Sequence, residues 1–382
     1  MRILWHSNSE EDCTGYGRQT RYWAPLFREL GHEVAISAFH GHGSQPGDFG
    51  GIPVYPGGDD PWGMDVVAGH YKHFGADLLI TLQDMWPCDP AGLAGLNVAH
   101  WVPVDCSPLG AGDKRVLEAT GGRVIAMSRF GQQELVKAGF ADAACVPHGI
   151  DTTLFSPMAE HGRLLLRRLT GIRGKFVIGV NAANQDQRRK SFPQQFRAFA
   201  RFRAKHDDAV LLVHTRADNK VVDGLDLYAL ARACGLVAGR DLFFCPQYEY
   251  RNGLIGDDAM ASWYRMLDVL SMPSHGEGFG LPLIEAQACG VPVITTRASS
   301  MTELCGAGWL VDGEPYWLRD QEAWWTAPSE TQIFRCYERA YKDAGKLAAR
   351  ARAFAIQYDV RQVLKQYWAP VLDALSSAAR PS

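Results

Sequence analysis

The alternation of apolar strand-like runs with helical patterns constrains the fold of this chain more than any other feature. One series of such units extends from an expected strand at residues 1–6 to another at 144–147. A second series extends from 175–180 to 291–296. Repeated strand–helix units build parallel sheets whose faces are covered by helices. The sequence therefore predicts an α/β protein with two successive Rossmann-like lobes.

A turn-rich stretch at 147–151, Pro-His-Gly-Ile-Asp, separates the two series. We expect an N-terminal lobe over residues 1–155 and a C-terminal lobe over 156–354. A long amphipathic pattern at 348–375 follows, and we expect a helix over about 355–382 to pack back on the N-terminal lobe.

Charge and cysteine content exclude several functional classes. The net charge of −3 gives no strong basic field, so we expect no nucleic-acid binding. The nine cysteines are scattered without CxxC spacing, which is typical of reduced thiols in a cytoplasmic protein. The first residues are expected to form a strand rather than a secretion signal. No apolar stretch approaches the ~18 residues of a membrane span, so any membrane contact is expected to be peripheral.

Residues 275–286, HGEGFGLPLIEA, carry the strongest indication of chemistry. They follow an expected strand and open a helix, and glycines at alternate positions let a ligand approach the backbone. The free N–H groups of a helix start favour a diphosphate or sugar oxygens. The carboxylates of Glu277 and Glu285 can accept hydrogen bonds from sugar and ribose hydroxyls. The alternative is a capped surface helix with two incidental glutamates.

The pair Glu277 and Glu285, within GEGFGLPLIEAQACGVPVI, resembles the EX7E signature of retaining glycosyltransferase family 4, which has the GT-B fold. The glycine loop near the N-terminus, the segment VPHGIDTTLFSP and the segment from Asn184 to Phe192 resemble other parts of that family in the same order. The resemblance implies two lobes facing a central cleft. It also implies a hexosyltransferase-like enzyme of carbohydrate biosynthesis that uses a UDP-, GDP- or ADP-sugar.

The resemblance also implies roles for individual residues. Glu277 would bind the transferred sugar and Glu285 the ribose, while the backbone from Gly278 through Phe279 and Gly280 to Leu281 would hold the sugar. Lys190 would neutralise the diphosphate. The family's arginine would stand near Asn184, and Arg189 or Arg188 could replace it. The chain has no D-x-D pair, so we expect no metal. We expect no other cofactor either.

Gly15 and Gly17 flank Tyr16 in a loop after the first strand, before a helix expected at 19–30. This loop either closes over the donor phosphates or forms a simple tight turn. It is a poor dinucleotide fingerprint, because Thr20 stands where the third glycine would be.

Two aspartates follow N-terminal strands. Asp105 either contacts the sugar or acceptor as a catalytic residue or caps its own loop, and Asp84 either serves the acceptor or plays a similar local role. In the second lobe, Pro246, Gln247 and Tyr248 either cradle the nucleobase or form an ordinary strand end. A basic cluster is either a solvated helix face or a contact for an anionic acceptor or lipid headgroup: Arg163, Arg167, Arg168, Arg173 and Lys175.

The leading hypothesis is therefore a metal-independent, retaining glycosyltransferase. It would move a sugar from a nucleotide-diphosphate donor to an acceptor that the sequence leaves open: a sugar, lipid, peptide or small molecule. Two alternatives remain. One is a non-catalytic subunit that binds sugar nucleotides, and the other is an NAD-dependent oxidoreductase with two Rossmann lobes.

Overall fold

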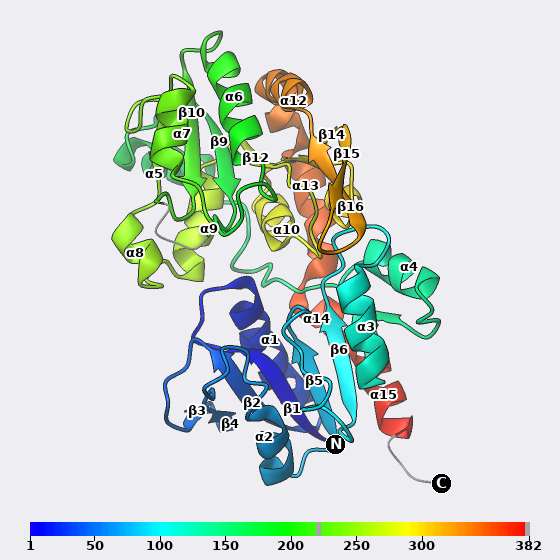
Figure 1. Ribbon diagram of the computed structural model, residues 1–382. Helices are drawn as coiled ribbons and strands as arrows, with labels where there is room; N and C mark the ends of the chain where they lie inside the picture. Colours follow the sequence, from blue (N-terminus) through cyan, green and yellow to red (C-terminus); the bar gives the residue numbers. More distant parts are fainter. Residues whose placement is uncertain (219–222, 379–382) are drawn as a thin grey trace. The chain divides into compact units, whose positions relative to one another are not determined.

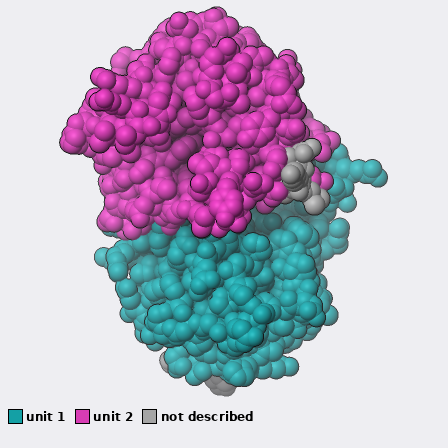
Figure 2. Space-filling view, turned by 90° about the vertical axis from the view of Figure 1, so that its left-hand side faces the viewer, with its two compact units in different colours: residues 1–149, 317–323, 360–382 teal, residues 150–316, 324–359 magenta. Residues whose placement is uncertain are grey.

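The computed structural model describes residues 1–218 and 223–378 (Figure 1). The chain divides into two compact units, coloured in Figure 2. Unit 1 comprises residues 1–149, 317–323 and 360–382, and unit 2 comprises 150–316 and 324–359. The last four residues of the helix expected at 355–382 lie outside the described residues.

Unit 1 contains an eight-stranded sheet with the order β3-β4-β2-β1-β5-β6-β7-β8. The neighbouring strands run parallel, except for the antiparallel pair β3 and β4. The strands are β1 (Arg2–Asn8), β2 (Glu33–His40), β3 (Gly47–Phe49), β4 (Ile52–Tyr55), β5 (Leu78–Leu82), β6 (Val98–Val102), β7 (Arg123–Ala126) and β8 (Ala144–Cys145).

The helices of unit 1 include the last described part of the chain. They are α1 (Gly15–Glu29), α2 (Val67–Phe74), α3 (Ala111–Thr120), α4 (Arg129–Lys137), α14 (Val360–Val363), a π-helical turn (Leu364–Trp368) and α15 (Ala369–Ala378). Trp368 is fully buried, and its ring lies 5.0–6.2 Å from four other aromatic rings: those of Trp5, Trp23, Phe27 and Trp101. This aromatic core ties the C-terminal segment to the sheet of unit 1.

Unit 2 contains a six-stranded parallel sheet with the order β11-β10-β9-β12-β13-β14. The strands are β9 (Phe176–Asn181), β10 (Ala209–His214), β11 (Leu242–Phe244), β12 (Val269–Met272), β13 (Val293–Thr296) and β14 (Gly308–Val311). A two-stranded hairpin follows, formed by β15 (Gly313–Leu318) and β16 (Ala323–Pro328), and its tip, 317–323, is assigned to unit 1.

The helices of unit 2 cover this sheet. They are α5 (Glu160–Leu169), α6 (Phe192–Arg203), α7 (Leu227–Ala233), α8 (Gln247–Arg251), α9 (Asp257–Arg265), α10 (Leu281–Ala288), α11 (Met301–Leu304), α12 (Glu330–Asp343) and α13 (Ala348–Ala355). Helix α12 lies beside α6 (Figure 1). Four buried phenylalanines of α6 belong to the hydrophobic core of unit 2: Phe192, Phe196, Phe199 and Phe202.

The amphipathic pattern at 348–375 is not one helix. Helix α13 ends at Ala355, and Asp359 takes an extended conformation before α14 begins. The Asp359 carboxylate accepts a 2.6 Å hydrogen bond from Thr152 Oγ1, and Ile150 N donates to Tyr358 O at 2.9 Å. These bonds tie residues 150–152 to unit 2, so the division falls after Gly149 rather than after residue 155.

Among the residues that the structure describes, no helix combines the length and apolar character needed to cross a membrane.

Candidate active site

The loop between β9 and α6 carries the basic residues of the site. Asp186 Oδ1 accepts backbone N–H bonds from Arg188 (2.7 Å) and Arg189 (2.5 Å), which closes a tight turn. Lys190 O accepts a bond from Gln195 Nε2 at 2.8 Å, and Gln195 Oε1 accepts one from Ser271 Oγ at 2.9 Å. The backbone of Lys190 is thereby fixed against strand β12.

The signature segment starts after β12 and lies against that loop. His275 N donates to Arg189 O at 2.8 Å, and His275 Nδ1 lies 3.0 Å from Ser191 Oγ. Gly280 caps α10 with φ 111°, a backbone angle that favours glycine. This glycine offers no side-chain hydrogen bond to the first turn of α10, so the N-terminal amides of the helix are suited to a ligand.

Two serines after β13 hold the backbone of the signature. Glu277 N donates to Ser299 Oγ at 3.0 Å, while Ser300 Oγ donates to Glu277 O (2.8 Å) and to Phe279 O (2.5 Å). Sequence reasoning missed both serines. The available signal was their place just past the carboxyl end of a neighbouring parallel strand, where ligand sites gather.

Glu277 forms the centre of a buried ion-pair group. Its Oε1 pairs with Lys190 Nζ, and its Oε2 lies 3.3 Å from Arg189 Nη1. The side chains of Lys190 and Glu277 are only 9% and 8% exposed, whereas Arg189 is 33% exposed. Burial opposes ionisation of Glu277, but the charges of Lys190 and Arg189 and a hydrogen bond from Lys190 outweigh it and lower its pKa.

This group brings together three of the residues predicted from sequence. One carboxylate faces two cations, so the group carries one net positive charge on a loop next to an uncapped helix start. Arg188, the other candidate arginine, is engaged elsewhere, because its Nη1 donates to Tyr316 Oη at 2.6 Å. The structure therefore favours Arg189 as the partner of Lys190.

Glu285 is also buried, one turn into α10. Its Oε2 accepts a 2.7 Å bond from Tyr264 Oη, and Tyr264 Oη in turn accepts one from Asn181 Nδ2 at 2.7 Å. The second glutamate of the signature is thus held by a network that reaches the carboxyl end of β9. Sequence spacing gave no indication of Tyr264.

Asn184 and Gln247 have local structural roles. The Asn184 amide makes three hydrogen bonds of 2.7–3.0 Å with the backbone of Arg216 and Leu225. These bonds fasten two loops together. Gln247 accepts a bond from Ala217 N and donates to Thr215 O. Pro246 caps α8, and the Tyr248 side chain next to it is 67% exposed.

Gly15 and Gly17 are part of α1 rather than of the loop expected before residue 19. The Thr14 side chain caps the helix by accepting a bond from Gly17 N at 3.2 Å. A Cβ on Gly17 would lie 2.3 Å from Asp12 O, so this position requires glycine for close backbone approach.

Asp84 and Asp105 follow the adjacent parallel strands β5 and β6, and both belong to unit 1. A third carboxylate, Asp113 on α3, was missed. Burial, followed by the charges of Asp105 and Asp84, raises the pKa of Asp113 to about 7. Tyr16 Oη lies 3.4 Å from Asp84 Oδ1, so the start of helix α1 reaches this acidic group.

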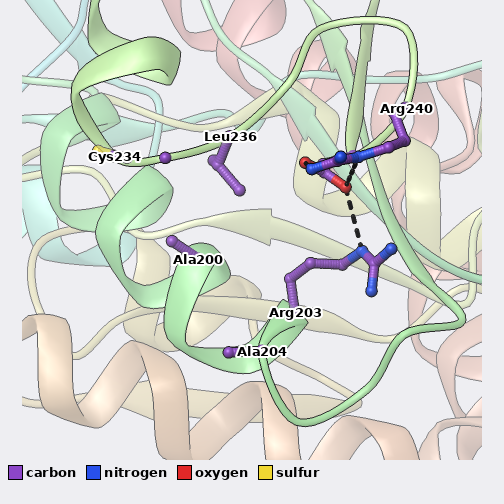
Figure 3. A pocket seen from close by; sticks show the side chains of 8 residues that line it. Ala200, Arg203, Ala204, Cys234, Leu236 and Arg240 are labelled. Carbon is purple, nitrogen blue, oxygen red and sulfur yellow. Dashed lines mark hydrogen bonds and ion pairs between the residues drawn. The ribbon is translucent and has the colours of Figure 1, made fainter.

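A hollow of about 240 Å³ lies elsewhere in unit 2, between the ends of α6 and α7 (Figure 3). It contains none of the predicted site residues. Asp241 lies 3.3 Å from Arg203 Nε and 2.8 Å from Arg240 Nη2, so this carboxylate is already paired with both arginines of the hollow.

Solved structures with a similar fold extend over nearly the whole chain. Sucrose-phosphate synthase from Thermosynechococcus elongatus is similar with a TM-score of 0.76 at 17% identity, over 99% of this chain and 100% of that one. The Anabaena Alr3699/HepE complex with UDP-glucose is similar with a TM-score of 0.69 at 19% identity, over 98% and 100%. The chain has the GT-B fold. This confirms the predicted α/β architecture of two Rossmann-like lobes.

Comparison with known sequences supports an enzyme of the glycosyltransferase class. Residues 180–327 match the family model described as glycosyl transferases group 1, and this range includes the basic loop and both signature glutamates. A D-inositol 3-phosphate glycosyltransferase of Arthrobacter sp. (strain FB24) is 29% identical over 280 residues, which are 71% of this chain and 61% of the relative. The chain spans about 60% of the length of the curated relatives it matches.

Proposed function

We propose that the chain is a retaining glycosyltransferase that uses a nucleotide-diphosphate sugar. The observation that carries the proposal is the buried group of Glu277, Lys190 and Arg189 beside the uncapped start of α10. A diphosphate needs concentrated positive charge and N–H donors, and this group offers both. The match to glycosyl transferases group 1 and the relatives' names support the same activity.

In this proposal the donor exchanges partners with the ion-pair group. The diphosphate binds Lys190 and Arg189, and this releases the Glu277 carboxylate to accept hydrogen bonds from the hydroxyls of the transferred sugar. The amides of Phe279, Gly280 and Leu281 add donors to the same sugar. Cations held in place before reaction stabilise the charge that grows on the leaving diphosphate.

Glu285 is proposed to bind the ribose hydroxyls, with Tyr264 holding its carboxylate in place. Pro246, Gln247 and Tyr248 are proposed to lie near the nucleobase. Of these, Tyr248 has an exposed ring that a base could stack on.

The proposed transfer keeps the configuration of the sugar. The bond from the anomeric carbon to the diphosphate oxygen breaks, and the acceptor oxygen bonds to that carbon on the same face. The acceptor proton passes to the departing diphosphate. In this scheme the two cations act by position and charge, and neither a metal nor another cofactor takes part.

Asp84 and Asp105 are proposed to face the acceptor in unit 1, with Asp113 next to them. The relatives are named for D-inositol 3-phosphate, but three neighbouring carboxylates would repel a phosphate. We therefore propose an acceptor that carries hydroxyl groups without a phosphate on the part that meets these residues.

Turnover of a panel of UDP-, GDP- and ADP-sugars tests the proposal, with chelator present and with inositol and inositol phosphate as trial acceptors. We expect nucleoside diphosphate release by the wild type, and loss of at least about 100-fold in Glu277→Gln and Arg189→Met. Lys205→Met, a change at an exposed lysine, serves as the control. Wild-type turnover in both site variants would refute the proposal, and an inverted product anomer would refute its retaining step.

A further inference from the structure

Helix α5 (Figure 1) lies at the start of unit 2, and two of its arginines hold it to the protein. Arg167 is buried, and its guanidinium donates to Met266 O at 2.6 and 2.9 Å and to Asp268 Oδ2 at 2.8 Å. Arg163 donates to the other oxygen of Asp268 at 2.5 Å and to Leu267 O at 3.2 Å. The segment between α9 and β12 thus holds two cations of one helix.

Three of the four leucines of the same helix face solvent. Leu164, Leu165 and Leu169 are 44%, 56% and 75% exposed. A helix on a globular protein normally buries its leucines and exposes its arginines, whereas α5 exposes three leucines and buries Arg167. Since the ion pairs of Arg163 and Arg167 with Asp268 already secure the helix, the exposed leucines contribute little to the fold of unit 2.

Two further cations border these leucines. Arg168 lies one helical turn after Leu164, and Arg173 lies just beyond the end of the helix, and both are exposed. The one acidic residue of α5, Glu160, lies 3.7 Å from Arg163 at the other end. We name Leu164, Leu165, Arg168, Leu169 and Arg173 the α5 face. It combines an apolar centre with a cationic border.

The α5 face lies away from the proposed donor site within unit 2. Asp268 and Met266 precede β12, so α5 is fixed near the amino end of that strand. The signature segment leaves β12 at its carboxyl end. An occupant of the α5 face would therefore leave the group around Glu277 open.

We propose that the α5 face docks on an anionic lipid surface. Its leucines would enter the boundary between headgroups and acyl chains, while Arg168 and Arg173 would pair with lipid phosphates. We favour an anionic lipid surface as the occupant because the cationic border complements a negatively charged bilayer. The inference is independent of the proposed transfer activity.

Flotation of the full chain with lipid vesicles tests the inference. We expect the wild type to float with mixed phosphatidylcholine–phosphatidylglycerol vesicles, to bind pure phosphatidylcholine at least about tenfold more weakly, and to lose binding as salt is raised. The combined change Leu164→Ser, Leu165→Ser and Leu169→Ser should weaken binding by about tenfold or more. The pair Arg168→Glu and Arg173→Glu should do the same.

Matched changes elsewhere in unit 2 provide controls. Val237→Ser with Leu254→Ser removes exposed apolar side chains, and Arg335→Glu with Arg339→Glu reverses two exposed charges of α12. Both controls should bind as the wild type does. The inference is overturned if the wild type ignores anionic vesicles, or if the controls lose as much binding as the α5 variants. It is also overturned if sedimentation without lipid shows a wild-type dimer that the leucine changes convert to a monomer, since a second copy would then cover the face.

Discussion

Replacing Lys190 with methionine tests how much the ion-pair group contributes to the stability of unit 2. Methionine keeps most of the side-chain volume but removes the charge that faces Glu277. Both side chains are less than 10% exposed, so the change leaves a buried carboxylate that keeps Arg189, at 3.3 Å, as its paired cation. Removing one partner of a buried ion pair typically costs about 3–5 kcal/mol.

We expect the low end of that range, about 3 kcal/mol, because Arg189 remains. For a unit of about 200 residues this corresponds to a fall in melting temperature of roughly 6–12 °C. In the wild type the pKa of Glu277 is lowered, so its stabilisation is present above its unfolded pKa and is lost as pH falls through the folded pKa. In the variant, Arg189 is the one paired cation whose charge opposes the effect of burial, so the pKa of Glu277 is higher than in the wild type. The difference between the two proteins should therefore be largest at pH 7 and shrink toward pH 4.

Differential scanning calorimetry of the ligand-free chains at pH 7 and at pH 4 measures both effects. The control is Lys205→Met, because Lys205 is 62% exposed and lies 3.9 Å from Glu338. Such a surface pair contributes about 0.5 kcal/mol or less, so its melting temperature should move by roughly 1–2 °C. If Lys190→Met melts within the range of the control, or if its deficit is as large at pH 4 as at pH 7, our reasoning about the buried pair is wrong.

Three further outcomes follow from the geometry. Gly17→Ala should destabilise unit 1 in urea unfolding by more than 1 kcal/mol, since its Cβ would meet Asp12 O. The control Gly69→Ala, in open space on α2, should be neutral or stabilising by about 0.5 kcal/mol. Equal effects of the two changes would refute the steric argument. Asp113→Asn should raise the melting temperature more at pH 8 than at pH 5, because a pKa raised to about 7 makes the wild type lose stability as pH rises through 7; a pH-independent difference would contradict this. Tyr264→Phe should raise KM for the donor more than it lowers kcat, because it frees the carboxylate proposed to bind ribose; an unchanged KM would contradict that role.

The strand–helix rhythm was sufficient to predict the parallel sheets, but short or edge elements gave too little pattern. Helices α2 and α3 and the edge pair β3 and β4 were missed for this reason. The break after α13 was missed because amphipathic periodicity continues on both sides of it. Beyond the break, Asp359 accepts a bond from Thr152, a contact between residues more than 200 positions apart that local periodicity does not encode.

At the candidate site, too, local motifs could be predicted from the sequence, whereas contacts between distant residues could not. Glu277 and Lys190 were predicted from local motifs, but their contact joins residues 87 positions apart and periodicity does not encode it. The resemblance places the family's arginine near Asn184, and in the structure the Asn184 amide fastens backbone loops, which the local motif does not indicate. The exposed leucines of α5 were overlooked, because leucine in a helical pattern ordinarily indicates a buried face.

A crystal structure with a bound nucleotide-diphosphate sugar tests the central claim most directly. Our account predicts diphosphate oxygens within about 3 Å of Lys190 Nζ and of the Arg189 guanidinium, and sugar hydroxyls on the Glu277 carboxylate, with the ion pair to Lys190 opened. A bound donor that leaves that pair intact and places its phosphates on other residues would contradict it.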